Sequence, residues 1–272
     1  MSTTKRKDEH LDLCIQKNVQ SAGSAGWDDI ALPHHALPDI DFSEIDLRTE
    51  FLGRTFSAPL LISSMTGGSE KGERINEVLA IFASENNIPM GVGSQRVALE
   101  NKDTPLFSLR KIAPKATLYA NIGAVQLNYG VGIDECRYLV ETLQAQALIL
   151  HLNPLQEAIQ KEGDRNFKGL WTKIEGLCKQ IQVPVILKET GCGLDVQSCL
   201  KAKESGVAAV DVAGFGGTHW GYIEGLRNTE REELGNAFRN WGIPTVKSLH
   251  QARQALGPNY PIIASGGGEK RC

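Results

Sequence analysis

Seven short apolar runs recur along this 272-residue chain, and segments with helical periodicity separate them. The runs are Pro59–Ser63, Pro89–Gly93, Ala116–Ile122, Ala147–Leu152, Pro184–Lys188, Ala208–Ala213 and Pro261–Ser265. Uninterrupted apolar runs of this length predict strands that are buried on both faces, which is typical of a parallel sheet. The first six runs begin roughly 30 residues apart, the length of one strand with its crossover helix. The chain is therefore expected to have an α/β fold.

The segments between these runs carry apolar stripes at helical spacing. The three clearest stripes are Ile75, Val78, Leu79, Phe82 and Ala83; Leu170, Ile174, Leu177, Cys178 and Ile181; and Leu249, Ala252 and Leu256. Gly257 and Pro258 end the third stripe, because glycine and proline are the usual residues that stop a helix. Each stripe predicts a helix that packs on the sheet through that face.

Polar or glycine-rich clusters follow nearly every predicted strand. They are Ser64–Gly68, Ser94–Arg96, Asn121, His151–Asn153, Lys188–Thr190 and Gly216–Thr218. A (β/α)₈ barrel brings the carboxyl ends of all its strands to one face, around one site. A doubly wound sheet would instead concentrate such residues at a single switch point. The distribution favours a TIM (β/α)₈-type barrel.

The predicted barrel occupies residues 59–272, and residues 1–58 form an N-terminal extension. Residues 214–244 are a long connection rich in glycine, tryptophan and charge, and a connection of this length predicts a functional lid. Only seven strands are found, and five residues follow Gly267. We therefore expect a barrel that is truncated after its seventh strand.

The composition excludes several classes of protein. Lys and Arg total 29 against 32 Asp and Glu, a net charge of −3, which is not the basic surplus of a nucleic-acid binder. No apolar run reaches the ~18–20 residues of a membrane span, and the polar first residues predict no signal peptide. The six cysteines form no CxxC pair, so neither a zinc site nor a disulfide framework is expected. Cys136, Cys178 and Cys199 are predicted to be buried thiols in a reducing, cytoplasmic compartment.

The most unusual stretch is His151-Leu152-Asn153-Pro154-Leu155-Gln156-Glu157. Strand alternation aims His151 and Asn153 to the same side, and Pro154 ends the strand. Gln156 and Glu157 would then lie at the barrel mouth. The Glu157 carboxylate can hold Mg²⁺ that bridges to a phosphate, or it is a first-turn glutamate favoured by the helix dipole. The residues alone leave both interpretations open.

Lys188 ends an apolar strand, and a lysine inside a barrel is costly unless it faces an anion. The carboxyl end of a barrel strand is also where catalytic groups lie. The functional interpretation is therefore favoured at this position. An anionic reduced flavin, a phosphate or a Schiff-base carbonyl would each explain the lysine.

Other polar segments have both a functional and a structural interpretation. Met65–Gly68 suits a close backbone approach to a ligand or simply a tight turn. Arg96 suits a bidentate phosphate contact, although a surface arginine is common. Arg6–His10 is a solvated charge run, or it folds over a polyanionic ligand. The glycines and aromatic residues of Gly214–Trp220 suggest a loop that faces a ligand.

Taken together, these motifs resemble the type 2, FMN-dependent isopentenyl-diphosphate delta-isomerases. The matching segments are Arg6–His10, Ser64–Gly68, Gly93–Arg96, Asn121–Gly123, His151–Glu157, Lys188–Glu189 and Ala213–Thr218. They follow the family's order over essentially the whole chain, and the ordered set is far more specific than any one motif. The resemblance implies a barrel enzyme that interconverts isopentenyl and dimethylallyl diphosphate, with FMN, Mg²⁺, and NADPH as the flavin reductant.

The resemblance also implies roles for individual residues. The expected substrate contacts are Arg6, Lys7, His10, Ser94, Gln95, Arg96, His151, Asn153 and Gln156. The expected FMN contacts are Ser64, Met65, Thr66, Ser94, Asn121, Lys188, Thr218, Gly266 and Gly267. Glu157 would hold the metal, and Gln156, His151 and Lys188 would take part in catalysis beside reduced flavin, which supplies the acid–base group. Residues 1–58 would carry a substrate-binding arm, and a complete chain would form a homotetramer or homo-octamer.

In this family the segment that matches Ser265–Gly267 continues into an arginine-containing helix start, which grips the FMN phosphate together with the loop after strand eight. That continuation has no counterpart here, so the comparison predicts weak FMN binding. Two alternatives remain. One is an inactive, truncated remnant, and the other is an FMN barrel oxidoreductase of the 2-hydroxy-acid oxidase type. The second lacks support from the sequence, because no histidine–arginine pair lies near the seventh strand.

Overall fold

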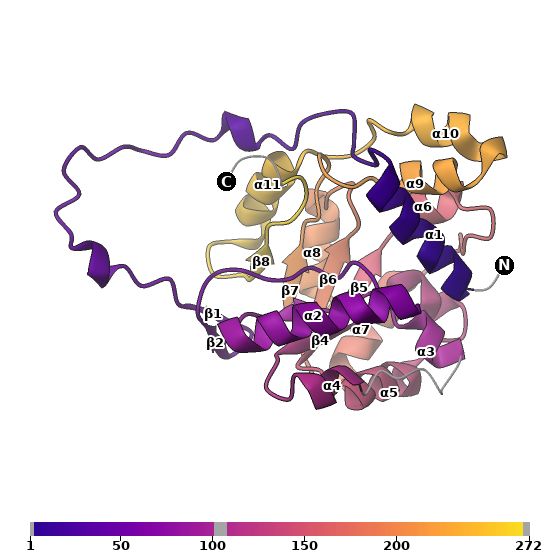
Figure 1. Ribbon diagram of the computed structural model, residues 1–272, viewed down its shortest axis with the longest axis horizontal. Coiled ribbons are helices and arrows are strands. Elements are labelled where there is room, and N and C mark those ends of the chain that lie inside the picture. Colours follow the sequence, from indigo (N-terminus) through magenta and orange to yellow (C-terminus); the bar gives the residue numbers. More distant parts are fainter. Residues whose placement is uncertain (1–2, 101–107, 269–272) are drawn as a thin grey trace.

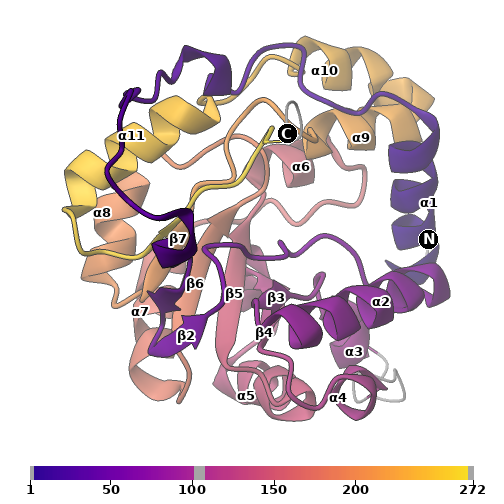
Figure 2. The same cartoon turned by 60° about the vertical axis from the view of Figure 1, so that its left-hand side comes forward.

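Six parallel strands curl into a half-barrel with helices around its outside (Figures 1 and 2). The computed structural model describes residues 3–100 and 108–268. The strands neighbour one another in chain order, and they are β3 (Met90–Gly91), β4 (Leu118–Gly123), β5 (Ala147–Leu152), β6 (Val185–Glu189), β7 (Ala209–Asp211) and β8 (Ile262–Ile263). The predicted α/β class and the incomplete (β/α)₈-type barrel are confirmed.

The first predicted strand, Pro59–Ser63, joins the sheet through a single parallel bridge. Ile62 pairs with Met90, and the amides of Ile62 and Gly91 donate to the carbonyls of Pro89 and Ile62 at 3.0 and 2.9 Å. This run therefore lies beside β3 in the position predicted for it. It extends the curved wall of the half-barrel by one segment of chain.

Most of the helices lie against the outer face of the sheet, and the others lie over its carboxyl edge. The helices are α1 (Thr3–Gln16), α2 (Glu70–Asn86), α3 (Arg96–Glu100), α4 (Ser108–Ile112), α5 (Ile133–Leu143), α6 (Pro154–Ile159), α7 (Leu170–Gln180), α8 (Val196–Glu204), α9 (Trp220–Arg227), α10 (Glu232–Ala237) and α11 (Thr245–Leu256), with short 3₁₀ turns η1 (Trp27–Asp29), η2 (Phe42–Glu44), η3 (Ala124–Asn128) and η4 (Thr229–Arg231). Across residues 3–100 and 108–268, no helix combines the length and the apolar character needed to cross a membrane. The outer core lies between these helices and the sheet, and the predicted stripes on α7 and α11 pack into it.

Helix α2 forms where it is predicted, but its predicted buried face is only partly confirmed. Leu79 and Ala83 of the predicted stripe pack into the core, whereas Val78 and Phe82 are 67% and 51% exposed. The other buried residues of the helix are small or polar, among them Asn76 and Ala80. Short side chains let a helix lie close to its neighbours, so the larger side chains of α2 are left on the outside.

Inside the half-barrel, the side chains form an apolar layer below a polar one. The lower layer contains Tyr119, Ala147, Ile149, Ile186 and Ala209. Because side chains of a strand alternate between faces, the residue two positions further along each strand also points inward. Those residues are Asn121 on β4, His151 on β5, Lys188 on β6 and Asp211 on β7. A set of polar side chains therefore lies at the carboxyl edge of the sheet, on its inner face.

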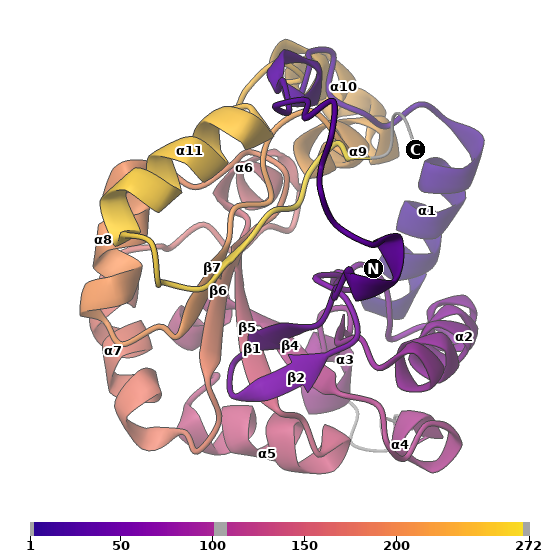
Figure 3. The ribbon, with the colours of Figure 1, turned by 90° about the vertical axis from the view of Figure 1, so that its left-hand side faces the viewer.

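A two-stranded hairpin closes the lower end of the half-barrel, and the sequence analysis did not anticipate it. Strands β1 (Thr49–Phe51) and β2 (Arg54–Phe56) pair antiparallel. Phe51 and Leu52 pack against the interior layer, with the Phe51 ring 6.5 Å from that of Tyr119. The hairpin lies at the opposite end of the strands from α1 (Figure 3). It removes the lower face of the interior layer from water.

Between η1 and the hairpin, residues 30–48 leave the body of the molecule as a long strap (Figure 1). Its apolar side chains are largely in solvent: Leu32, Leu37 and Phe42 are 85%, 84% and 88% exposed. The connection 214–244, predicted as a lid, contains helices α9 and α10 and the turn η4. Its helices α9 and α10 pack on each other, and α9 packs on α6.

The cysteines match the sequence-based prediction. Cys136 and Cys199 are fully buried on their helices, and Cys178 is partly buried. Burial raises the pKa of the Cys136 thiol to about 12 and that of the Cys199 thiol to about 11. These are unreactive structural thiols. Cys272 lies outside the described residues.

Replacing glycine by alanine should have opposite effects on stability at Gly53, in the hairpin turn, and at Gly176, in α7. Gly53 has φ +74°, and a Cβ there would meet nothing within 4 Å. Gly53→Ala should therefore destabilise the fold by ~1 kcal/mol through backbone strain alone. Gly176, within α7, also has open space around its Cβ, so Gly176→Ala should stabilise the fold by ~0.5–1 kcal/mol. Urea unfolding measures both changes, and equal effects of the two variants would contradict the prediction.

Candidate functional site

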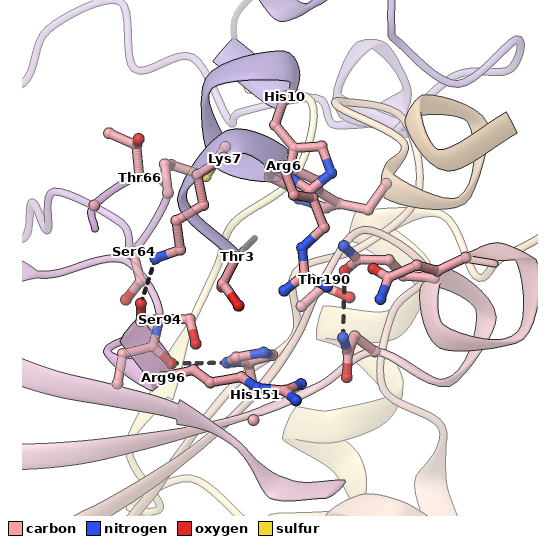
Figure 4. Close-up of a pocket in the computed structure, with 18 of the residues that line it drawn as sticks. Thr3, Arg6, Lys7, His10, Ser64, Thr66, Ser94, Arg96, His151 and Thr190 are labelled. Carbon is pink, nitrogen blue, oxygen red and sulfur yellow. Dashed lines mark hydrogen bonds between the residues drawn. The ribbon is translucent and has the colours of Figure 1, made fainter. Parts of the chain in front are cut away.

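A cavity of about 330 Å³ opens at the carboxyl edge of the sheet, below helix α1. Its volume is within the range of small-molecule sites. Figure 4 shows side chains from α1, from the segment after the first strand and from the strand ends converging on it. The predicted site residues that line it are Arg6, Lys7, His10, Ser64, Met65, Thr66, Ser94, Arg96, Asn121, His151, Asn153, Gln156, Glu157 and Lys188. Polar segments that lie far apart in the sequence thus share one space.

Four predicted site residues do not line this cavity. Gln95 is 3% exposed and lies behind it, where its Oε1 accepts a hydrogen bond from the Asn121 amide at 2.9 Å. Thr218 forms an antiparallel bridge with Gln20. The Gly266 carbonyl accepts from the indole of Trp27 at 3.1 Å.

The predicted ligand-facing loop after β7 packs on other parts of the chain. Gly267 lies so close to Gly217 that a Cβ on Gly217 would come within 2.6 Å of the Gly267 nitrogen. The carbonyl of Gly217 also accepts from the amide of Ser21 at 2.8 Å. Thr218, Gly266 and Gly267 thus form a second cluster with the segment that follows α1.

Helix α1 presents one face to the cavity. Its lining residues recur at helical spacing, and they are Thr3, Arg6, Lys7, His10, Leu11 and Cys14. The helix packs between α2 and α9, and Lys7 Nζ donates to the carbonyl of Ser94 at 2.6 Å. Burial, partly offset by Glu73, lowers the pKa of Lys7 to about 8. The charge run of the sequence is therefore the roof of the cavity.

A buried carboxylate on α9 ties this roof to the wall of the cavity. Glu224 Oε1 lies 2.9 Å from His10 Nε2 and accepts from Gln156 Nε2 at 3.1 Å. Its Oε2 pairs with Arg227, which also contacts Glu9 at 3.1 Å. Burial alone would raise the pKa of Glu224, but the His10 hydrogen bond and the Arg227 charge lower it overall. Glu224 thus fixes which way the Gln156 amide points.

His151 is held as a neutral ring. Its Nδ1 lies 2.9 Å from Asn121 Oδ1, and the Asn121 amide nitrogen donates to the Val92 carbonyl at 3.0 Å. Burial, together with the charges of Lys188 and Lys7, lowers the pKa of His151 to about 3. Because Asn121 Oδ1 can only accept, Nδ1 carries the proton. Nε2 is then an acceptor at the cavity side.

Arg96 on α3 is held by two carboxylates. Its guanidinium contacts Asp164 at 2.7 Å and Glu100 at 2.9 Å, and Gln126 Nε2 also donates to Asp164 at 3.0 Å. The two ion pairs leave the planar guanidinium at the cavity wall in one orientation. A planar fork fixed in this way suits a bidentate contact with an oxyanion.

Glu157 is buried at the start of α6. Its Oε1 accepts from Asn153 Nδ2 at 2.8 Å and its Oε2 from the Asp164 amide at 2.7 Å. Burial raises its pKa above the ordinary value. Among the described residues, no group of three or more His, Cys, Asp or Glu side chains is placed to hold a metal ion. A hard cation at Glu157 would need further ligands from water and a bound phosphate.

Two polar atoms at the cavity have no hydrogen-bond partner. They are Ser64 Oγ and Asn153 Oδ1, both buried. Ser64 is in the segment that passes over β3. This segment can lie so close to the chain after β3 because residue 93 is a glycine: a Cβ on Gly93 would lie 2.1 Å from the Thr66 carbonyl oxygen. Unpaired buried acceptors and hydroxyls are costly. Both atoms therefore mark positions where a polar ligand atom would be bound.

The sequence analysis missed several residues of the site. Glu224, Asp164 and Asp211 were not singled out. Trp220, the last residue of the loop predicted to face a ligand, does line the cavity and meets the His10 ring edge-on at 5.3 Å. A signal for Asp211 was present, because a carboxylate within an apolar strand is as costly as Lys188. Glu224 and Asp164 are in connections, where no periodicity pointed inward.

Curated proteins resemble the chain over nearly its whole length, although no family model matches it. An isopentenyl-diphosphate delta-isomerase of Synechococcus sp. is 51% identical over 270 residues, which are 98% of this chain and 77% of that protein. The corresponding protein of Nostoc sp. is 48% identical, over 97% of this chain and 77% of its own length. That of Oceanobacillus iheyensis is 46% identical, over 96% and 76%.

Solved structures share the fold at low sequence identity. A lactate oxidase from Pediococcus acidilactici has a TM-score of 0.55 at 14% identity, covering 97% of this chain and 67% of that one. An active chimera of (S)-mandelate dehydrogenase also has a TM-score of 0.55, at 15% identity over 98% and 72%. These likenesses bear on the fold alone.

The neutral His151 predicts a loss of stability in acid. The folded state resists protonation of this ring down to about pH 3, whereas the unfolded chain binds the proton near pH 6.5. Stability is therefore lost as the pH falls from about 6.5, because the unfolded state binds more protons. His151→Asn, which keeps a donor for Asn121, should lose roughly 3 °C less in melting temperature than the wild type between pH 7 and pH 4.5.

Thermal melts over this pH range test the prediction. The matched control is His250→Asn on the exposed side of α11, which should follow the wild type. Glu189, whose pKa burial raises to about 7, titrates in the same window in all three proteins and cancels in the comparison. Parallel curves for wild type and His151→Asn would show that the ring is not held neutral.

Proposed function

Because the chain belongs to the type 2 isopentenyl-diphosphate delta-isomerase family, we propose that it interconverts isopentenyl and dimethylallyl diphosphate with the help of FMN. The observation that carries the proposal is the convergence of fourteen expected ligand-binding residues on one cavity. Cationic groups and apolar side chains meet there, as a charged isoprenoid requires.

The diphosphate would bind under α1. Arg6, Lys7 and Arg96 line that part of the cavity, and Arg96 is already oriented by its carboxylate partners. Charge-assisted hydrogen bonds from such groups are the strong contacts to phosphate oxygens. Mg²⁺ would bind to Glu157 and to phosphate oxygens, since a single carboxylate with phosphate ligands is a usual site for this ion.

The cavity residues fit an isoalloxazine ring with its polar edge toward the strand ends. Ser64 Oγ lacks a partner, Asn121 and Lys188 lie near the carboxyl ends of β4 and β6, on either side of β5, and Gly93 lets the Thr66 segment approach β3. When bound and reduced by NADPH, FMN would supply the acid–base group for the allylic proton shift. The isomerisation itself has no net redox change.

The other cavity residues would orient the reactants. Glu224 turns the Gln156 amide so that its nitrogen donates, and its oxygen accepts from Asn153 Nδ2 at 3.3 Å. An amide is too weakly basic to remove a proton alone. His151 would offer its neutral Nε2 as an acceptor. Positioning of this kind contributes to rate by aligning the reacting atoms before the proton moves.

The apolar wall of the cavity suits the five-carbon tail. Leu11 and Cys14 of α1, Ile75 of α2 and Trp220 of α9 line one side of it. Burial of a branched C5 chain against such side chains is favourable by ~25 cal/mol per Å². The tail would therefore lie away from the cationic end.

One assay separates the proposal from its alternatives. The chain is supplied with saturating FMN, dithionite or NADPH, Mg²⁺ and isopentenyl diphosphate, and dimethylallyl diphosphate is measured as acid-labile product. Product that needs reduced flavin supports the proposal. Oxidation of a 2-hydroxy acid without isomerisation would favour the oxidase type, and neither reaction at saturating FMN would favour an inactive remnant. FMN titration followed by absorbance in the same samples measures how tightly the flavin binds.

Lys7 should make substrate binding weaken in alkali. Its pKa of about 8 means that the ammonium loses its proton within the working range. We expect the KM for isopentenyl diphosphate to rise about tenfold between pH 7.5 and pH 9.5, the loss of one charge-assisted contact. Lys7→Arg should remove most of this rise because a guanidinium stays charged. Steady-state KM values across this range test it, and an unchanged pH dependence in Lys7→Arg would assign the rise to another group.

A further inference from the structure

A buried carboxylate lies on β7 that the proposed reaction does not use. Asp211 is 1% exposed, and its neighbours in the sequence are Val210 and Val212. It does not line the cavity. An ionised carboxylate in such surroundings is costly unless it is paired with a cation.

The cation opposite is Lys188. The two residues are directly paired across β6 and β7, and both point into the half-barrel. Lys188 Nζ lies 3.7 Å from Asp211 Oδ2, with side-chain exposures of 8% and 2%. The pair is therefore shielded from the solvent that weakens ion pairs on a protein surface.

The second oxygen of Asp211 is held from two sides. Oδ1 accepts from Ser265 Oγ after β8 at 2.5 Å and from the amide of Ala213 at 3.2 Å. The carboxylate therefore cannot turn freely, and Oδ2 stays directed at Lys188. The ammonium also donates to the Glu189 carbonyl at 2.9 Å. Of its three N–H groups, at least one remains for the cavity that Lys188 lines.

We propose that Asp211 is the positioning residue of Lys188: held by Ser265, it keeps the ammonium group directed into the cavity, where the charge meets the anionic edge of a bound ligand. The inference rests on the proposed function for the identity of that ligand, the reduced flavin. Asp211 itself touches neither substrate nor cofactor. Residues on β6, on β7 and just after β8 together fix the position of the Lys188 ammonium group.

Other charged groups also surround Lys188. From β5, His151 faces it, and from α1 Lys7 adds a second positive charge near the same ring. Glu189 on its own strand accepts three backbone N–H groups of the following loop, from Thr190, Cys192 and Gly193. These bonds hold its carboxylate at that loop, although the charge of Lys188 still lowers its pKa. Without Asp211 the buried ammonium would lose the carboxylate that is paired with it across β6 and β7.

The test uses the full chain without flavin, so that its result is independent of whether the isomerase proposal holds. Urea unfolding midpoints are measured between pH 7.5 and pH 10 for wild type, Asp211→Asn, Ser265→Ala, Lys188→Met and the double variant Lys188→Met/Asp211→Asn. In Asp211→Asn the folded state sheds the lysine proton more readily than the unfolded chain. Its midpoint should therefore fall, relative to wild type, as the pH is lowered.

The double variant should show no such dependence, because no charge is left to titrate. Ser265→Ala, which keeps the carboxylate but loosens it, should lie between wild type and Asp211→Asn. Asp195→Asn, a helix-cap carboxylate on α8, is the control for the change in net charge and should give no added slope. Lys7 titrates in this window in every protein and cancels.

The outcomes are decisive in either direction. A pH-dependent deficit in Asp211→Asn that Lys188→Met restores supports the proposal, and so does a chain that folds as the double variant but not as Asp211→Asn. An equal, pH-independent loss in both would show that Asp211 serves only the hydrogen bonds to Ser265 and Ala213, and would overturn it. Reduced isomerase activity alone decides neither case.

Discussion

The two-residue period of the parallel strands is the constraint on which the site depends. Along each strand, alternate side chains enter the half-barrel, so an apolar residue at one level places the residue two positions later one level higher. His151 therefore lies one level above Ile149, and Lys188 lies one level above Ile186. The apolar level is sealed below by the hairpin. The polar level is left as the floor of the cavity, and its groups are positioned by backbone hydrogen bonds.

In the roof and walls of the cavity, the side chains are positioned mainly by the pairing of cationic groups with carboxylates. The cavity gathers Arg6, Lys7, Arg96 and Lys188, which repel one another when no anion is bound. Carboxylates just outside the cavity lining offset this repulsion: Asp164 and Glu100 pair with Arg96, and Asp211 pairs with Lys188. The ring of His151 adds no further positive charge, because its pKa is lowered. The cavity thus presents positive charge inward while its supports carry the compensating negative charge.

Much of this arrangement is readable in the sequence, and the failures have physical reasons. Buried parallel strands are apolar throughout, so the runs that contain Leu118, Ala147 and Val185 were recognisable, and the polar groups after them followed from the geometry of barrels. The stripe on α2 was misjudged at Val78 and Phe82 because small residues, not large ones, decided which face lies close to the body. The hairpin escaped notice because its strands have three residues each. Glu224 was missed because pairing across 214 positions of sequence with His10 leaves no local pattern.

The exposed strap of residues 30–48 has a consequence for how the polypeptide can be divided. On one side of it, α1 and the segment after it are fastened by contacts that do not involve the strap: Lys7 with Ser94, His10 with Glu224, and the Ala25 carbonyl with the Val246 amide. On the other side the hairpin is fastened to the interior layer. A peptide bond severed near Leu37 would break continuity without breaking any of these contacts. The roof of the cavity is thus, in physical terms, a separate piece that binds the rest of the protein, and could be supplied to it as a free peptide.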